Sequence, residues 1–164
     1  MNILETAPIS TVRRNHGIEH ATVHVLTGRD PNTRLVGRAD TTGFNIYGDV
    51  PTKELESAAN EALERLNNGE GNLAVHPRCG TNLVVAGLVT ALAAIIAIGR
   101  KPSFKKIPDV ILATTLAAYV SQPLGLTFQE YITTSPDARG ARITGVRQFK
   151  MGQIQAQHVD IEWE

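Results

Sequence analysis

The sequence predicts an α+β fold: a small domain of two helices and two β-hairpins with an embedded transmembrane helical hairpin. The first observation is that residues 79–99 and 110–129 contain no charged side chain, although the whole chain carries 16 basic and 16 acidic ones. The second is a series of apolar residues at helical spacing within 52–66. The third is that short segments flank turn-forming residues in two places, as in β-hairpins.

Composition restricts the partners that we expect. The formal net charge is zero and both signs are mixed, so the chain offers no basic surface for nucleic acid, and we expect none as a partner. The single cysteine, Cys79, excludes an internal disulfide and leaves this thiol either inert or chemically employed. The lipid bilayer is an expected partner, whereas the substrate and the oligomeric state are left open.

Residues 1–80 are expected to form the N-terminal α+β part. Ser10 can cap a helix that runs to about Leu26 and ends at Gly28. Segments 34–39 and 44–47 flank a turn and predict the first β-hairpin.

A second helix is expected to begin at Thr52, which can cap it, and to end at Gly69. Its apolar residues fall on one stripe, which predicts a buried face made of Leu55, Ala58, Ala59, Ala62, Leu63 and Leu66. Residues 73–76 are expected to be extended and to stop at Pro77.

Residues 81–130 are expected to hold two transmembrane segments, because the apolar runs 83–99 and 110–128 would each cover about 30 Å as helices. The second run contains Ser121, Gln122 and Pro123, so it can be kinked or packed against the first. The alternative is a soluble α+β protein whose central helices are buried, but two charge-free runs in succession are hard to bury in 164 residues. Residues 131–164 are expected to form a C-terminal β-hairpin around Met151 and Gly152 that completes the soluble part.

The first candidate functional group lies on the first helix. His16, Glu19 and His20 share one helix face because residues three and four apart are neighbours, and His24 lies one turn beyond His20. Two imidazoles at this spacing can reach one metal ion, and zinc is the default divalent ion for such a site. Glu19 could be a ligand, a partner of a ligand, or a catalytic base. A solvated polar face is the alternative, and His24 is expected to line the site.

The second candidate group is the sequence HPRCGT at residues 76–81, just before the first apolar run. His76 and Cys79 form a plausible ligand pair, and the start of a helix favours a thiolate at Cys79. Arg78 adds positive charge there, and Thr81 could line the site. Together the two groups offer four nitrogen and sulfur ligands: His16, His20, His76 and Cys79. Burial as a small apolar residue is the alternative for Cys79, and His158, on an expected strand, is interpreted as structural.

These motifs, in this order, resemble a family of uncharacterised bacterial membrane proteins that are regarded as metal-dependent enzymes. Residues 14–83, including GFNIYGDV at 43–50, are similar to a smaller relative common in photosynthetic bacteria. Residues 129–134 (QEYITT) stand where the larger family has a Gln-x-x-Thr-Thr-type motif. The resemblance implies that the two candidate groups form one site, and that this site is approached by Gln129, Thr133 and Thr134. Two departures are Ala21, where the larger family has a basic residue, and a membrane region of only two segments.

The resemblance implies a location in the bacterial inner membrane. The loop between the apolar runs carries four basic residues, which by the positive-inside rule would face the cytoplasm. No signal-like N-terminal segment explains export of the preceding half, however, so we expect the soluble part in the cytoplasm.

We expect a metal-dependent membrane hydrolase in which His16, His20, His76 and Cys79 bind zinc and Glu19 is the general base. One alternative is a metal-free acyl-transfer or protease-like enzyme with Cys79 as the nucleophile. The other alternative is a membrane protein that binds metal without catalysing a reaction.

Overall fold

The computed structural model describes residues 3–152 and 154–164 and divides into two compact units. The first unit comprises the chain up to His76 and from Ile132 onward, and the second comprises Pro77–Tyr131. The first unit mixes helices with a four-stranded antiparallel sheet, and the second contains two helices apolar enough to cross a membrane. The predicted α+β fold class is confirmed.

The sheet of the first unit joins the two expected hairpins. Its strands are β1 (Val36–Ala39), β2 (Gly43–Tyr47), β3 (Ala141–Met151) and β4 (Ile154–Trp163), in the order β1-β2-β4-β3. The hairpins meet where β2 pairs with β4 in an antiparallel register that sets Phe44 opposite Val159. Residue 153, in the turn expected between the last two strands, lies outside the described residues. The sequence predicted each hairpin but not their union into one sheet.

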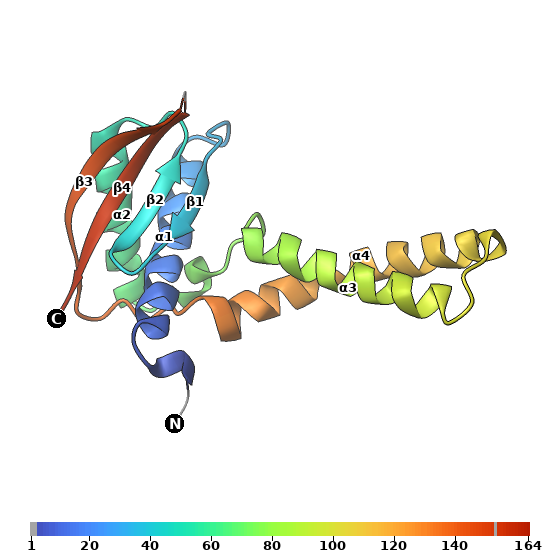
Figure 1. The fold of residues 1–164 in the computed structure, drawn as a ribbon. Coiled ribbons are helices and arrows are strands. Elements are labelled where there is room, and N and C mark those ends of the chain that lie inside the picture. The colour runs from blue at the N-terminus through green and yellow to red at the C-terminus, as the bar shows by residue number, and fades with distance from the viewer. Residues whose placement is uncertain (1–2, 153) are drawn as a thin grey trace. The chain divides into compact units, whose positions relative to one another are not determined.

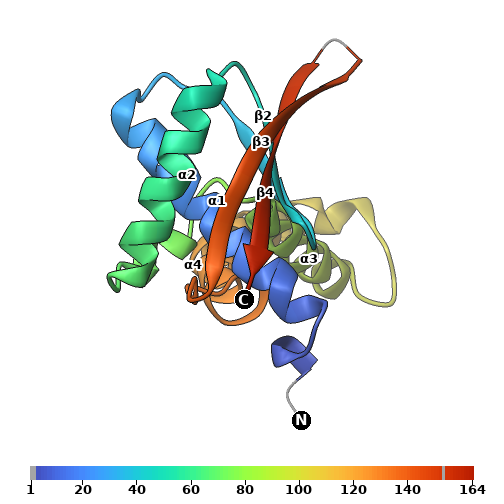
Figure 2. The same ribbon diagram turned by 90° about the vertical axis from the view of Figure 1, so that its left-hand side faces the viewer.

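Two helices cover one face of this sheet, α1 (Ile9–Arg29) and α2 (Thr52–Asn67), as Figures 1 and 2 show. Alternate residues of β2 and β4 face them, so Phe44, Ile46 and Val159 are fully buried. The expected stripe of α2 faces the same core: Leu55, Ala58, Ala59, Ala62 and Leu66 are buried, and Leu63 is half-buried against it. The core therefore lies between the helices and one side of the sheet.

Three local expectations about helix ends were wrong. α1 begins at Ile9, two residues before the start that a cap at Ser10 predicts, and Thr52 is the first residue of α2 and not its cap; neither helix has a side-chain cap. Pro8 and Pro51 occupy the N-cap positions, and proline has no side-chain oxygen that could accept from the first amides of a helix. At the other end α1 continues through Gly28 to Arg29, because the backbone of Asp30 closes the last turn.

The chain between α2 and the second unit was also expected to be extended, but Gly71–Ala74 form a short 3-10 helix, η2. The amide of Leu73 donates to the carbonyl of Glu70 and that of Val75 to Asn72, so local hydrogen bonds replace the strand pairing that an extended segment would need. A further 3-10 turn, η1 (Ile3–Glu5), precedes α1.

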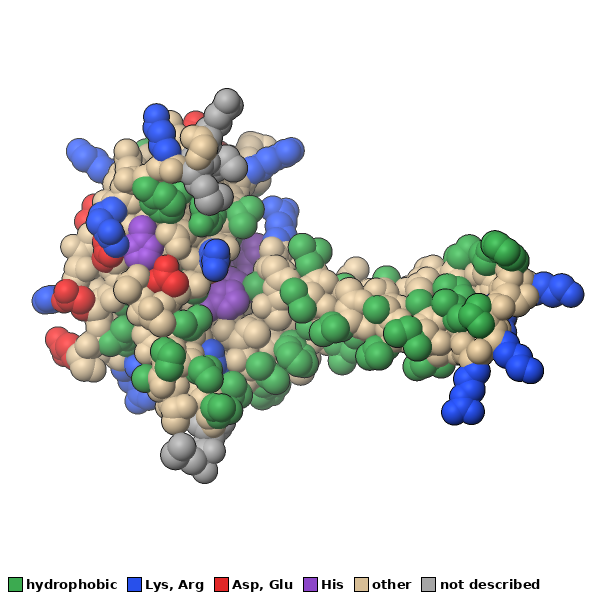
Figure 3. Space-filling model, in the orientation of Figure 1, with side chains coloured by type: hydrophobic (Ala, Val, Ile, Leu, Met, Phe, Trp, Pro, Cys, Tyr) green, Lys and Arg blue, Asp and Glu red, His purple; other side chains and the backbone are tan. Residues whose placement is uncertain are grey.

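The second unit is a helical hairpin of α3 (Gly80–Ile98) and α4 (Ile107–Phe128), with the 3-10 turn η3 (Phe104–Lys106) between them. Gly99 (φ 62°) ends α3, and the Lys106 ammonium caps it by donating to the carbonyl of Ile98 at 2.6 Å. A π-helical turn, η4 (Gln129–Thr133), follows α4. Many apolar side chains lie on the face of the hairpin that Figure 3 shows. In the most apolar 18-residue stretch of each of its two helical segments, only 6% and 11% of the residues are buried. A core helix of a soluble protein would be mostly buried instead.

Replacing Leu55 by Ala tests the packing of α2. Leu55 is fully buried, so its truncation should lower the free energy of unfolding of the first unit by roughly 2–5 kcal/mol. The half-buried Leu63 should cost less when it is replaced by Ala. Trp163 is the single tryptophan of the chain and lies on β4, so its fluorescence during denaturation in detergent reports this unit. Equal and negligible losses for both variants would contradict this packing.

Candidate metal site

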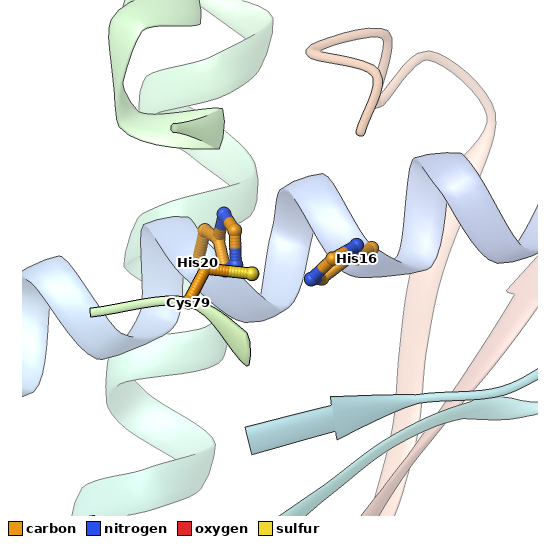
Figure 4. Close-up of side chains that lie close together, drawn as sticks. All are labelled: His16, His20 and Cys79. Atoms are coloured by element: carbon orange, nitrogen blue, oxygen red, sulfur yellow. The ribbon is translucent and has the colours of Figure 1, made fainter. Parts of the chain in front are cut away.

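The candidate site begins with three histidines spaced by four residues on α1, which places their rings on one side of the helix. The ring centroids of His16 and His20 are 4.3 Å apart, and Figure 4 shows both side chains on this face. Residues 17–23 of α1 are all buried, so the histidine rings do not belong to a solvated face of the helix. The alternative of a solvated polar face does not describe this helix.

Backbone carbonyls orient both rings. The Nδ1 of His16 lies 2.9 Å from the carbonyl oxygen of Thr133, and the Nδ1 of His20 lies 2.8 Å from that of Ala74. A carbonyl oxygen can only accept, so each Nδ1 carries the proton and donates it. In metal-binding histidines the second ring nitrogen usually donates to a carbonyl or a carboxylate in this way, which directs Nε2 toward the metal.

The environment of His20 keeps its ring neutral. Burial lowers the pKa of His20 from 6.5 to about 3, and the neighbouring His16 contributes in the same direction. Both effects disfavour the imidazolium, because a buried charge loses its hydration and like charges repel. His20 is therefore able to offer an unprotonated nitrogen throughout the physiological pH range.

Glu19 is buried on the same helix, with its Oε2 3.9 Å from the Nε2 of His16. The strand β1 makes room for this carboxylate through Gly37. A Cβ added to Gly37 would lie 2.0 Å from Oε1 of Glu19 and 2.3 Å from its Cδ, so no other residue fits without moving the side chain. The carboxylate is thus confined beside His16, where it could accept a proton or bind a cation. Gly37 was not singled out by the sequence, because nothing local marks it.

His76 and His24 lie side by side, with ring centroids 4.7 Å apart, whereas His76 is 6.0 Å from His20. The Nε2 of His24 lies 2.9 Å from the carbonyl oxygen of Val75, so this ring is also held by η2 and the residues after it. His76 was expected among the four ligands. Its ring lies nearer to His24 than to His20.

Thr133 and Thr134 act through their backbones. Thr133 supplies the carbonyl that orients His16, and the carbonyl of Thr134 accepts from Arg13 at 3.1 Å. The amide of Ser135 donates to the carbonyl of Arg13 at 2.9 Å. Segment 133–135 therefore runs along the N-terminal half of α1 and is fixed to it by several bonds. The resemblance implied that both threonines approach the site, and these contacts place their backbone carbonyls against α1.

The remaining expected site residues belong to the second unit. Cys79 is the N-cap of α3, and its sulfur accepts a hydrogen bond from the amide of Thr81 at 3.4 Å. Arg78 is exposed. Gln129 is fully buried, and its Nε2 donates to Oδ1 of Asn82 at 2.6 Å. Asn82 was missed in the sequence, although a polar amide at the start of a charge-free run is a signal that could have found it.

His16, His20 and Cys79 carry donor atoms that could hold a metal ion. Two imidazole nitrogens and a thiolate suit zinc and other borderline or soft divalent ions better than magnesium or calcium, which prefer oxygen. His158 is separate from this group: it lies on β4 with its Nδ1 3.0 Å from Oδ1 of Asn45.

Comparisons with known proteins identify relatives without a known activity. A family described as "Domain of unknown function (DUF6391)" matches residues 11–146. An uncharacterised protein of the cyanobacterium Picosynechococcus sp. is 36% identical over 135 residues. That match covers 76% of this chain and 66% of the relative, so the chain spans just under two thirds of the relative's length. No solved structure shows a significant match to this chain.

Replacing Gly37 by Ala tests the confinement of Glu19. The added methyl group would overlap the carboxylate, so the first unit should lose about 1–3 kcal/mol of stability, as overpacked sites do. Gly28→Ala is the matched control, because a Cβ there meets nothing within 4 Å and alanine favours a helix. Denaturation followed by Trp163 fluorescence measures both. If Gly37→Ala were as stable as Gly28→Ala, Glu19 would not be held against β1.

Proposed function

Because this chain belongs to the DUF6391 family, whose description assigns no activity, its function must be inferred from the site, and we propose a metal-dependent membrane enzyme. In this proposal His16, His20 and Cys79 bind one divalent ion, zinc by preference, and the reaction is a hydrolysis. The observation that carries the proposal is the pair of Nδ1 hydrogen bonds to Thr133 and Ala74. They fix the tautomer and orientation that two metal-binding imidazoles need.

The chain itself supports Cys79 as the third ligand. Cys79 follows His76 by three residues, so the connecting segment spans at most about 10 Å. His76 already lies beside the histidines of α1. Cys79 is the N-cap of α3, and a cysteine sulfur is a ligand that zinc readily accepts. His76, which the sequence suggested as a further ligand, is proposed here to line the site together with His24, so that one position on the metal stays open.

Glu19 supports the assignment to hydrolysis. Zinc held by three protein ligands supplies Lewis acidity and leaves one position for a reactant. Glu19 is buried beside His16, where its carboxylate can take a proton from an attacking water and return it to the leaving group. Glu19 is expected not to be a ligand itself, because β1 holds its carboxylate in place through Gly37.

A second candidate function is covalent catalysis without metal. It is favoured by one observation, the position of Cys79 as the N-cap of a 19-residue helix. In that case Cys79 would attack an acyl group and form a thioester, a neighbouring histidine would pass the thiol proton to the expelled leaving group, and water would then release the acid. A metal site without catalysis is the remaining possibility, and metal analysis together with Glu19 variants separates the three.

We also propose that the helical hairpin crosses the bacterial inner membrane. α3 and α4 have 19 and 22 residues, and their outward-facing side chains are almost all apolar. An exposed apolar surface of this extent would drive aggregation in water, whereas in a bilayer it is solvated by lipid. We place the first unit in the cytoplasm, since Arg78, Arg139 and Arg142 flank the spans in the sequence.

Elemental analysis of the purified chain tests the metal site. Wild-type protein prepared with zinc should hold about one equivalent, and His20→Ala should abolish stoichiometric zinc because it removes a ligand. His158→Ala is the control and should retain zinc. Glu19→Gln should also retain zinc, since its role is proton transfer.

Two results would count against this assignment. Wild-type protein without metal that still reacts through Cys79 with acyl-directed probes would favour the covalent alternative. Loss of zinc from Glu19→Gln would make Glu19 a ligand and leave the proposed reaction without its base.

Leu92→Arg tests the membrane assignment. Leu92 is exposed on α3, so arginine would be tolerated there if the hairpin lay in water. At the centre of a membrane helix it should cost about 2.5–3.5 kcal/mol of insertion and reduce accumulation in membranes. Asn60→Arg, on the exposed side of α2, is the matched control. Wild-type protein should resist carbonate extraction; full recovery as a monodisperse protein without detergent would contradict the proposal.

A further inference from the structure

The turn that carries Cys79 is closed by a side chain to which the proposed chemistry gives no role, Asn82. Asn82 lies in the first turn of α3, and its Nδ2 donates to the carbonyl of Pro77 at 2.7 Å. Its backbone amide donates to the carbonyl of Cys79 at 3.0 Å. One residue therefore holds both ends of segment 77–79 against the start of the helix.

The oxygen of the Asn82 side-chain amide accepts a hydrogen bond from the π-helical turn η4, which follows α4. Gln129, which is fully buried, donates from its Nε2 to Oδ1 of Asn82 at 2.6 Å. Asn82 thus uses its amide NH₂ toward Pro77 and its amide oxygen toward Gln129. The two bonds are complementary, because they also fix which side of the amide carries the oxygen.

Gly125 of α4 lets the two helices approach at this point. A Cβ added to Gly125 would lie 2.5 Å from Oδ1 of Asn82 and 3.1 Å from its Cγ, so a larger residue would displace the amide. Small residues at helix–helix contacts and amide hydrogen bonds across them are typical of membrane hairpins. Asn82, Gln129 and Gly125 therefore form one contact that joins the start of α3 to the end of α4.

We propose that Asn82, fixed by Gln129 and Gly125, is a positioning residue that sets the location of the Cys79 thiol. The proposal rests on the proposed function in one respect, that Cys79 is a ligand or a nucleophile. The physical reason is that Asn82 ties the turn at both ends, since its side-chain amide donates to the carbonyl of Pro77 and its backbone amide donates to the carbonyl of Cys79. Without the Asn82 amide, the carbonyl of Pro77 would lose its bond, and the turn could open.

The alkylation rate of Cys79 in the full chain, purified in detergent without added metal, measures this directly. Cys79 is the only cysteine and its side chain is buried, so iodoacetamide reacts with it when the turn opens. Asn82→Ala should raise the rate about fivefold or more, the factor that corresponds to one lost hydrogen bond. Asn82→Asp should do the same, because it keeps the oxygen that Gln129 binds but loses the donor to Pro77.

Glycine variants give a matched pair on the same hairpin. Gly125→Ala should also raise the alkylation rate, since it displaces the Asn82 amide, whereas Gly87→Ala should not, because a Cβ there meets nothing within 4 Å. If Asn82→Ala fails to accumulate, Asn82→Asp and Gly125→Ala decide the question. Wild-type rates in folded Asn82→Asp and Gly125→Ala would overturn the proposal.

A metal readout separates this inference from the proposed function. In cobalt-substituted protein, the thiolate charge-transfer band should weaken in Asn82→Asp and persist in Gly87→Ala. If wild-type protein binds no metal but alkylation responds as described, the positioning role stands and the metal function fails. If metal binds and neither the alkylation rate nor the charge-transfer band changes in the Asn82 variants, the metal function stands and the positioning role fails.

Discussion

Two hydrogen bonds, from Nδ1 of His16 to Thr133 and from Nδ1 of His20 to Ala74, constrain the histidines of the candidate site. Each connects α1 to a segment that adjoins the helical hairpin in sequence, Ala74 shortly before it and Thr133 shortly after it. The bonds therefore do two things at once. They orient the imidazoles, and they fix on α1 the two places where the chain leaves and re-enters the first unit.

The burial of α1 follows from this arrangement. A surface helix exposes one side, but α1 contacts α2 and the sheet, and η2 and segment 133–135 cover further parts of it. Its polar residues consequently meet partners within the protein. Asn15, for example, donates to the carbonyl of Asp40 and accepts from the indole of Trp163, on which the Arg14 guanidinium also stacks. Buried polar groups of this kind are stable only when they are hydrogen-bonded, so they also make the packing specific.

Buried polar groups are also hydrogen-bonded in the helical hairpin, where most of the surroundings are apolar. Most of its surface carries aliphatic side chains. The hydrogen bond between the side chains of Gln129 and Asn82 lies next to the turn that carries Cys79. A hydrogen bond between amides is strengthened where water is scarce, and a broken one is costly there. The histidines of α1 and the turn that carries Cys79 are thus held by carbonyls or side chains that take no part in the proposed reaction.

The sequence by itself determined the elements whose signal is local. The charge-free runs predicted α3 and α4, the stripe from Leu55 to Leu66 predicted the buried face of α2, and the four-residue spacing placed His16, His20 and His24 on one helix face. Tertiary structure alone decided the pairing of β2 with β4, the fit of Glu19 against Gly37, the carbonyl partners of the histidines and the role of Asn82. These contacts join residues far apart in the chain or depend on backbone atoms and missing side-chain volume. A residue pattern in a single sequence does not predict them. Backbone partners leave no mark in the sequence, because the backbone is the same at every position. A missing Cβ matters only when a distant group occupies the space that it leaves.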